Sequence, residues 1–423
     1  MVVAIGLALG SWQARAAGAI SDAPSYDDLA HPAHLYYQRP LHDRFTRIKA
    51  DLESGRVPLD QGSEKSFLIS LLKVLGVSPH SQMLVFSTTS LQLSLISPSN
   101  PRALYFNDEI YLGYVPGGRL EIVSLDPVLG GIYYLMDFPS PSRPMKIERS
   151  ERCMNCHAAE ETGYVPGLVI KSVIPAPGGG SLTSYRVGKT GHDIPLSQRF
   201  GGWHITGQPS FTQHWGNLTG RSISGRLETY PLTAGSRFDW ARYAASTSDL
   251  LPQLLHEHQA GFANRVLEAG YRARLALHLN PNGFSPAQEV ELEEQSERVV
   301  RYLLFADEAP LPDSGIQDSP DFRADFQKAA RRATSDGLSL RDLDLKTRLL
   351  RYRCSYMIYS PIFQELASPL RLKIYRALRR ALSLSAPQAA YSYLLDDEKR
   401  SILRILEATL PEFRGLAQRA ALE

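Results

Sequence analysis

The stretch Cys153-Met154-Asn155-Cys156-His157 constrains this chain more than any other part of the sequence. Its spacing is C-x-x-C-H, and on a helix the positions i, i+3 and i+4 share one face. Both thiols and the imidazole can therefore meet one edge of a flat macrocycle. Two thioethers would hold the macrocycle while the imidazole binds its central metal. The motif predicts one covalent haem c, attached through Cys153 and Cys156, with His157 as the proximal iron ligand.

Two other uses of paired cysteines are a redox dithiol and half of a zinc site. A dithiol normally occurs in a thioredoxin-like βαβ context, and a structural zinc needs a second Cys or His pair at short spacing. The sequence shows neither. The chain has 3 Cys in all, so Cys354 is left over and there is no disulfide framework. We expect Cys354 to be a buried, unreactive thiol.

Composition and the first residues bear on location. With 43% hydrophobic and 21% charged residues the chain is ordinary for a globular protein, and a formal charge of +2 gives no reason to expect nucleic-acid binding. Residues 1–16 predict a signal peptide: an apolar run from Val2 to Trp12 precedes Ala14-Arg15-Ala16, which resembles a cleavage site. The run has no basic residue before it, which suggests a start codon farther upstream. It is too short to span a bilayer, and no other segment predicts an integral membrane span. Because thioether attachment takes place outside the cytoplasm, we expect an exported, soluble, periplasmic protein.

The first half of the chain changes its period part-way. Residues 43–53 and 64–75 predict helices, and Gly76 is a stop for the second. From Met83 on, short β-prone runs alternate with Pro, Gly, Asn and Asp clusters, which is typical of an antiparallel meander. The predicted strands are residues 83–86, 91–96, 103–106, 110–115, 120–125 and 131–137, with 168–174 and 184–187 after the motif. Ser150 and Gly163 suit the two ends of a haem helix that interrupts this sheet.

The second half has helical periodicity. Ser248 is the expected cap of a long helix with an apolar stripe that includes His258, and Asp396 the expected cap of the last helix, which stops before Pro411. Further helices are predicted near 286–305, 321–333 and from Ser368-Pro369. The fold class expected is α+β: an antiparallel β-meander carrying the haem-attachment helix in residues 20–220, followed by a mainly α-helical region, 221–423, that covers the haem.

Several stretches together resemble a family of bacterial periplasmic single-haem c-type cytochromes that has no assigned reaction. The similarity covers most of residues 60–410 in the family's order. It rests on residues 81–87, 101–108, the haem motif with 165–167, 201–203 with 206–207, His214 with 216–217, 257–259 and 355–360. The resemblance implies a periplasmic protein with one haem. In the family pattern an aromatic residue usually stands where His204 is, which argues against His204 as a general ligand.

The sixth coordination position of the iron decides the function. A strong sixth ligand is typical of an electron carrier, whereas an open position permits catalysis or gas binding. We expect a side chain from residues 190–260 to close the distal side, with His214, His258 and His192 as candidates in that order. His258 lies in an apolar helical stripe, where a buried imidazole needs a partner. His256, two residues away, points elsewhere, so His256 and His258 do not form a metal chelate. Met154 lies between the two cysteines and is a poor candidate.

The leading functional hypothesis is one-electron transfer, with a protein of unknown identity as redox partner. The alternatives are a haem enzyme of peroxidase or oxidase type, since the chain is much longer than shielding one haem requires, and a haem-based sensor with an accessible distal site. A basic helix near residues 371–380 is expected to be a solvated face; docking of an acidic redox partner is the alternative. The sequence does not predict an oligomeric state, a reduction potential or a substrate.

Overall fold

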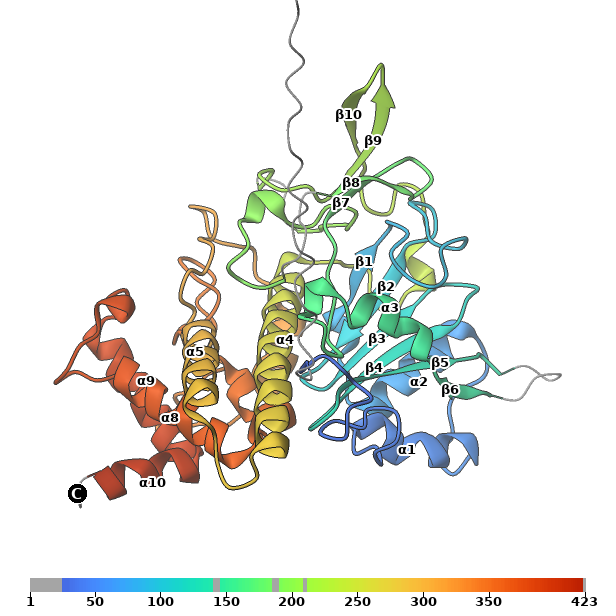
Figure 1. Cartoon of the computed structure of the whole chain (residues 1–423). Coiled ribbons are helices and arrows are strands. Elements are labelled where there is room, and N and C mark those ends of the chain that lie inside the picture. Colours follow the sequence, from blue (N-terminus) through green and yellow to red (C-terminus); the bar gives the residue numbers. More distant parts are fainter. Residues whose placement is uncertain (1–24, 140–144, 185–189, 208–210, 421–423) are drawn as a thin grey trace, which may run out of the picture.

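The computed structural model describes residues 25–139, 145–184, 190–207 and 211–420. The predicted signal peptide, residues 1–16, lies outside them. The architecture is α+β, as the sequence predicts: one antiparallel sheet belongs to the N-terminal half and long helices make up the C-terminal half. Figure 1 shows the sheet and its helices α1 and α2 on one side of the long helix α4, and α5, α8, α9 and α10 on the other.

Two helices precede the sheet, and each begins at a polar N-cap residue. In α1 (Arg44–Glu53), the side chain of Asp43 accepts hydrogen bonds from the amides of Phe45 and Thr46. In α2 (Glu64–Leu75), Ser63 starts a capping box and Gly76 ends the helix in the left-handed conformation, at φ 59°. Both predicted helices are confirmed.

Six strands form the sheet in the order of the sequence, each antiparallel to the next. Asn107 turns the chain between two of them, because its side-chain oxygen accepts from the amides of Glu109 and Ile110. Gly117, at φ 80°, makes the following turn. The strands are β1 (Met83–Val85), β2 (Arg102–Phe106), β3 (Ile110–Tyr114), β4 (Leu120–Asp126), β5 (Gly130–Met136) and β6 (Ile147–Arg149). The predicted meander is confirmed, with β6 added to it.

Other strand predictions need correction. Residues 91–96 form turns, not a strand, because the side chain of Gln92 bonds across to the amide and carbonyl of Arg119 and leaves the segment outside the sheet. The predicted strand 168–174 shrinks to β7 (Val173–Pro175), which pairs with β8 (Ser181–Ser184). Residues 185–187, the rest of the last predicted strand, lie outside the described residues. A hairpin of β9 (Leu218–Ile223) and β10 (Arg226–Pro231) was not predicted, and the expected regional boundary at residue 220 falls inside β9.

The helical half begins later than predicted. Asp249, not Ser248, precedes α4, and the Ser248 hydroxyl donates instead to the carbonyl of His204 at 2.7 Å. Likewise Asp396 and Ser368 are first helical residues and not caps. The helices are α4 (Leu250–Leu279), α5 (Pro286–Leu303), α6 (Pro320–Lys328), α7 (Pro361–Gln364), α8 (Ser368–Ala381), α9 (Asp396–Thr409) and α10 (Pro411–Ala420). The last of these was not predicted.

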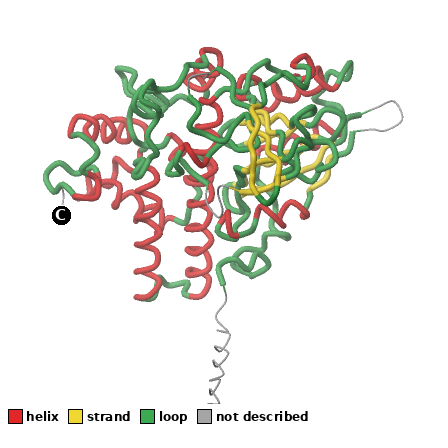
Figure 2. The backbone as a smooth tube through the Cα atoms, turned by 90° about the horizontal axis from the view of Figure 1, so that it is seen from above, coloured by secondary structure: helices red, strands yellow, loops and turns green. Residues whose placement is uncertain are grey.

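Each face of the sheet packs against a different layer. One face meets α1 and α2 in a core of aromatic and aliphatic side chains that includes Phe67, Tyr105 and Tyr134. The opposite face turns toward α4, whose buried residues join a second, larger core with α5 and α8. Figure 2 shows the strands gathered in one half of the molecule and most of the long helices in the other. Within the described residues, no helix is both long and apolar enough to cross a membrane.

Candidate functional site

The C-x-x-C-H motif follows the edge strand of the sheet. Strand β6 pairs with β5, and the chain then passes through a 3-10 turn, Glu151–Cys153, into the short helix α3, Met154–His157. Cys153 and Cys156 are both free thiols, the first half-buried and the second exposed. Met154, between them, is buried in the core that the sheet forms with α1 and α2, and Cys153 packs against the edge of that core. The short helical segment therefore carries both sulfurs, while Met154 contributes to the core.

The ends of this helix differ from the sequence prediction. Ser150 precedes the 3-10 turn without a side-chain cap, while its amide donates to the carbonyl of Tyr133 at 2.8 Å and so ties the turn to β5. Gly163, at φ 68°, ends a separate 3-10 turn, Glu160–Thr162. The haem helix is therefore only α3, held at its start by the sheet.

His157 is fixed by a hydrogen bond from one ring nitrogen. Its Nδ1 lies 2.9 Å from the carbonyl oxygen of Gly167, and that oxygen also accepts from the Tyr133 hydroxyl at 2.7 Å. A carbonyl only accepts, so the Nδ1 atom carries the proton and Nε2 keeps its lone pair. Burial lowers the pKa of His157, which favours the neutral ring. This is the state and orientation that a metal-binding imidazole requires.

A cavity of about 500 Å³ opens beside the motif. Its volume falls within the range of cofactor sites, and its lining is mainly apolar. Its floor is the sheet face turned toward α4, where residues two apart along each strand project to the same side. The three motif residues Cys153, Cys156 and His157 share the cavity with Val85, Leu91, Leu93, Leu104, Tyr111, Val123, Tyr133, Leu168, Val169, Trp203 and His256.

One ion pair crosses the cavity floor. The guanidinium of Arg102 lies 3.0 Å from the carboxylate of Glu121, and both side chains are largely buried. Gly113 is opposite Glu121 in the strand register and leaves space for the Arg102 guanidinium. A Cβ at residue 113 would stand 2.7 Å from Arg102 Nε. That Nε is buried and has no hydrogen-bond partner among the described residues. Arg102 therefore places a guanidinium on the cavity floor, where its positive charge suits an acidic group of a bound cofactor.

His256 also faces this cavity, which the sequence did not predict. It lies on α4, is 7% exposed, and packs against the rings of Phe106 and Tyr111 at centroid distances of 5.3 and 5.5 Å. Burial lowers the pKa of His256 to about 3, so its ring is neutral. Among the part of the chain that the structure describes, its ring has no hydrogen-bond partner.

The sequence candidates His258 and His192 lie elsewhere. They bond to each other, Nδ1 to Nδ1 at 2.7 Å, and the Nε2 of His258 is 2.7 Å from the hydroxyl of Ser355. Both rings stack on Phe305 in the helical core. The buried partner expected for His258 is therefore a histidine and a serine, and neither ring lines the cavity beside the motif.

His214 and His204 also lie outside that cavity. The ring of His214 packs between Phe200 and Phe211, and its Nδ1 accepts from the amide of Gly216 at 2.9 Å. His204 packs against Phe86, at 4.6 Å between ring centroids, in the interior. Of the histidines named in the sequence analysis, the structure brings only His157 and His256, which was not among the predicted distal ligands, into this cavity.

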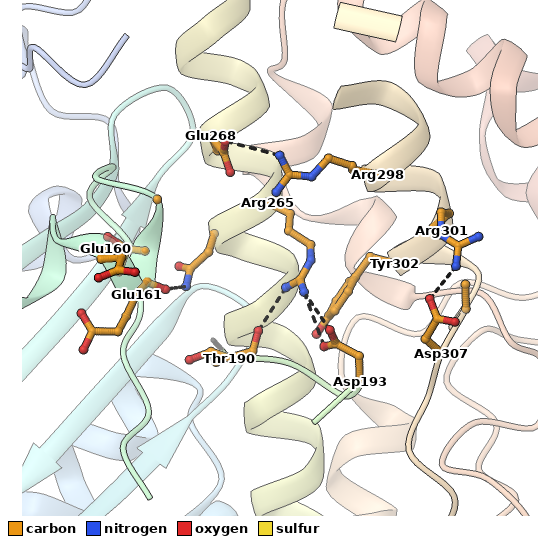
Figure 3. Close-up of a pocket in the computed structure, with 14 residues that line it drawn as sticks. Glu160, Glu161, Thr190, Asp193, Arg265, Glu268, Arg298, Arg301, Tyr302 and Asp307 are labelled. Atoms are coloured by element: carbon orange, nitrogen blue, oxygen red, sulfur yellow. Dashed lines mark hydrogen bonds and ion pairs between the residues drawn. The ribbon is translucent and has the colours of Figure 1, made fainter. Parts of the chain in front are cut away.

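A second cavity, of about 490 Å³, is lined by the loop that follows the motif and by residues of α4 and α5 (Figure 3). Its wall is charged, but the charges are paired: Arg265 with Asp193 at 3.3 Å, and Arg301 with Asp307 at 2.5 Å. Arg265 also lies over the ring of Tyr302, at 4.1 Å. The first pair joins α4 to the segment around residue 193, and the second joins α5 to the turn that follows it, so we interpret this cavity as a polar boundary between these elements.

The remaining sequence expectations concern Cys354 and the basic helix. Cys354 is fully buried, and burial raises the pKa of its thiol, which confirms the expected unreactive cysteine. On α8, four of the five basic side chains are in ion pairs within the chain, which ties that helix to its neighbours. The pairs are Arg371 with Glu412, Lys373 with Glu289, Arg379 with Glu407 and Arg380 with Glu293.

No family model, curated protein or solved structure matches the chain. In the described ranges, no three His, Cys, Asp or Glu side chains converge to hold a bare metal ion. Haem iron needs fewer protein ligands than a bare metal ion, because the porphyrin supplies four of them and the protein supplies only the axial ones. The cavity beside the C-x-x-C-H motif is therefore the feature of the molecule that bears most on its function.

Proposed function

We propose that this chain is a c-type cytochrome that binds one haem in the cavity beside α3 and transfers single electrons in the periplasm. Cys153 and Cys156 would each add a thiol across a vinyl group, the sulfur bonding to one carbon and the hydrogen passing to the other. His157 would bind the iron through Nε2. The bound group would supply a ferric–ferrous couple, and the chain would set its orientation and its access to water.

The observation that carries this proposal is the bond between His157 Nδ1 and Gly167. It leaves Nε2 as a lone-pair donor beside a cavity that two free thiols also line. The lining suits the ligand as well, because Leu91 and Leu93 are 43% and 57% exposed and a flat apolar group would cover them. The guanidinium of Arg102 on the cavity floor suits a propionate.

Electron transfer is favoured over catalysis by the position of the motif. Cys156 is exposed, so a haem attached to it would have one edge at the surface, where a redox partner can approach. The alternative, a haem enzyme or sensor, requires an open sixth position next to the iron. The proposed periplasmic location rests on the signal peptide predicted at residues 1–16 and on the need for haem attachment outside the cytoplasm.

The test is expression of the exported chain together with a cytochrome c maturation system. Haem should remain with the polypeptide through acid–acetone extraction and denaturing electrophoresis, and the intact mass should rise by one haem. Cys153→Ala with Cys156→Ala should abolish both signals, whereas the control Cys354→Ala should keep them. Haem that can be extracted from the unmutated protein would overturn the proposal.

A second measurement separates the carrier from its alternative. The unmutated protein should titrate as a reversible one-electron couple, be slow to take carbon monoxide, and have little activity with peroxide. His157→Ala should change the haem spectrum even where attachment survives. Immediate binding of carbon monoxide with turnover of peroxide would favour the enzyme.

A further inference from the structure

His256 differs from the other buried histidines of α4 in what its ring contacts. His258, two residues on, has both ring nitrogens engaged, one by His192 and one by Ser355. Two residues on a helix are separated by about 200° around its axis, so the two rings leave α4 on nearly opposite sides. His258 faces the helical core and His256 faces the cavity. The ring of His256, by contrast, has no hydrogen-bond partner among the described residues and lines the cavity.

The strand register places His256 relative to His157. Tyr111 of β3 is opposite Val123 of β4, which is opposite Tyr133 of β5. These three residues form one row across the cavity floor, two strand spacings or about 10 Å from end to end. The ring of His256 packs on Tyr111 at one end of the row, and the ring of His157 packs on Tyr133 at the other, 4.8 Å between centroids.

A flat macrocycle standing edge-on over Val123 would then have one imidazole on each face. All three residues of the row line the cavity, as do both histidines. The two imidazoles thus lie over opposite ends of one row of the cavity floor, with Val123 between them. Arg102, whose Nε has no hydrogen-bond partner among the described residues, also lines this cavity.

We infer that His256 is the second axial ligand of the haem iron, opposite His157. This inference rests on the proposed haem attachment. It gives the centre two imidazole ligands, a low-spin iron in both oxidation states, and no free position for carbon monoxide or peroxide. Of the three hypotheses kept from the sequence, which are electron transfer, a haem enzyme and a haem-based sensor, it selects electron transfer.

Absorption and electron paramagnetic resonance spectra of the holoprotein test the assignment. The unmutated protein should be low-spin, and His256→Ala should be high-spin and bind carbon monoxide at once, with haem still covalently attached. Added imidazole should restore the low-spin spectrum of His256→Ala. The matched control His278→Ala, on the last turn of the same helix, should keep the unmutated spectrum.

The outcomes separate the two proposals. Absence of covalent haem in the unmutated protein overturns the proposed function. Covalent haem that is high-spin in the unmutated protein, or low-spin in His256→Ala without added imidazole, overturns the role of His256 alone. If His256→Ala does not fold, His256→Met supplies the answer: a thioether ligand should give a low-spin centre with a higher reduction potential, and an unchanged potential would contradict the inference.

Discussion

His157 and Gly167 hold each other by two hydrogen bonds. The Nδ1 atom of His157 donates to the carbonyl of Gly167 at 2.9 Å, and the amide of Gly167 donates back to the carbonyl of His157 at 2.8 Å. Residue 167 can make this approach because it has no side chain. A Cβ there would stand 2.3 Å from the Asn264 side-chain oxygen, which accepts from the amide of Leu168.

The first prediction follows from this contact. Gly167→Ala should lower the free energy of unfolding by about 1–3 kcal/mol, because the new methyl group overpacks against Asn264 and Thr162. It should also raise the reduction potential, since a weaker bond to His157 Nδ1 makes the ring a poorer donor to ferric iron. Denaturant unfolding and potentiometry measure the two effects. Gly178→Ala, where a Cβ meets nothing within 4 Å, is the control and should change neither.

The charges of the cavity floor should act on the potential with opposite signs. Arg102→Gln removes a positive charge near the iron, which stabilises the ferric form and lowers the reduction potential. Glu121→Gln removes the negative charge that pairs with Arg102 and should raise the reduction potential. Each shift is expected to be tens of millivolts. Arg226→Gln, on the exposed strand β10, should leave the potential unchanged. Shifts of the same sign for Arg102→Gln and Glu121→Gln would contradict the placement of this pair beside the haem.

Much of the fold could be predicted from local signals. Ser63 and Gly76 bracket α2, and Asn107 and Gly117 turn the meander, because each interaction involves residues close in sequence. The apolar run at 91–96 predicts a strand wrongly, because its position depends on contacts with residues distant in sequence. Its leucines line a cavity or face solvent instead of joining a sheet, and only the fold reveals that.

The choice between His256 and His258 could not be made from sequence. An apolar stripe identifies the buried side of a helix that has one, but α4 is buried on nearly every side between Leu250 and Ala273. Both histidines are therefore buried, and the stripe gave preference to His258. The pairing of His258 with His192, 66 residues away in sequence, is a long-range contact without a local signature.

The two exposed leucines of the cavity give a third prediction. Leu91→Ser with Leu93→Ser should lower the reduction potential, because water nearer the haem edge stabilises the more charged ferric form. Stability of the protein prepared without haem should be nearly unchanged, since both side chains are exposed there. Leu95→Ser is the matched control: Leu95 belongs to the same segment and is 37% exposed, but it does not line the cavity. A double variant that behaves like Leu95→Ser would argue against a haem at this position.

The last prediction concerns pH and a carboxyl group remote from the motif. Burial raises the pKa of Glu308 from its usual 4.5 to about 7, although Arg353, Arg199 and Arg348 act to lower it. The folded protein therefore holds this proton more tightly than the unfolded chain does. The resulting stabilisation is fully present below about pH 4.5 and is lost as pH rises through 7.

Glu308→Gln keeps an uncharged side chain at every pH. The variant should therefore not lose stability in the way that the unmutated protein does as pH rises through 7. Urea unfolding at intervals from pH 5 to pH 8 should show the variant and the unmutated protein about equally stable at pH 5. At pH 8 the variant should be more stable, by about 2–3 kcal/mol at most. Glu294→Gln, at an exposed position of α5, should follow the unmutated protein throughout. Parallel curves for Glu308→Gln and the unmutated protein would show that Glu308 is ionised in the fold, held by the three arginines around it.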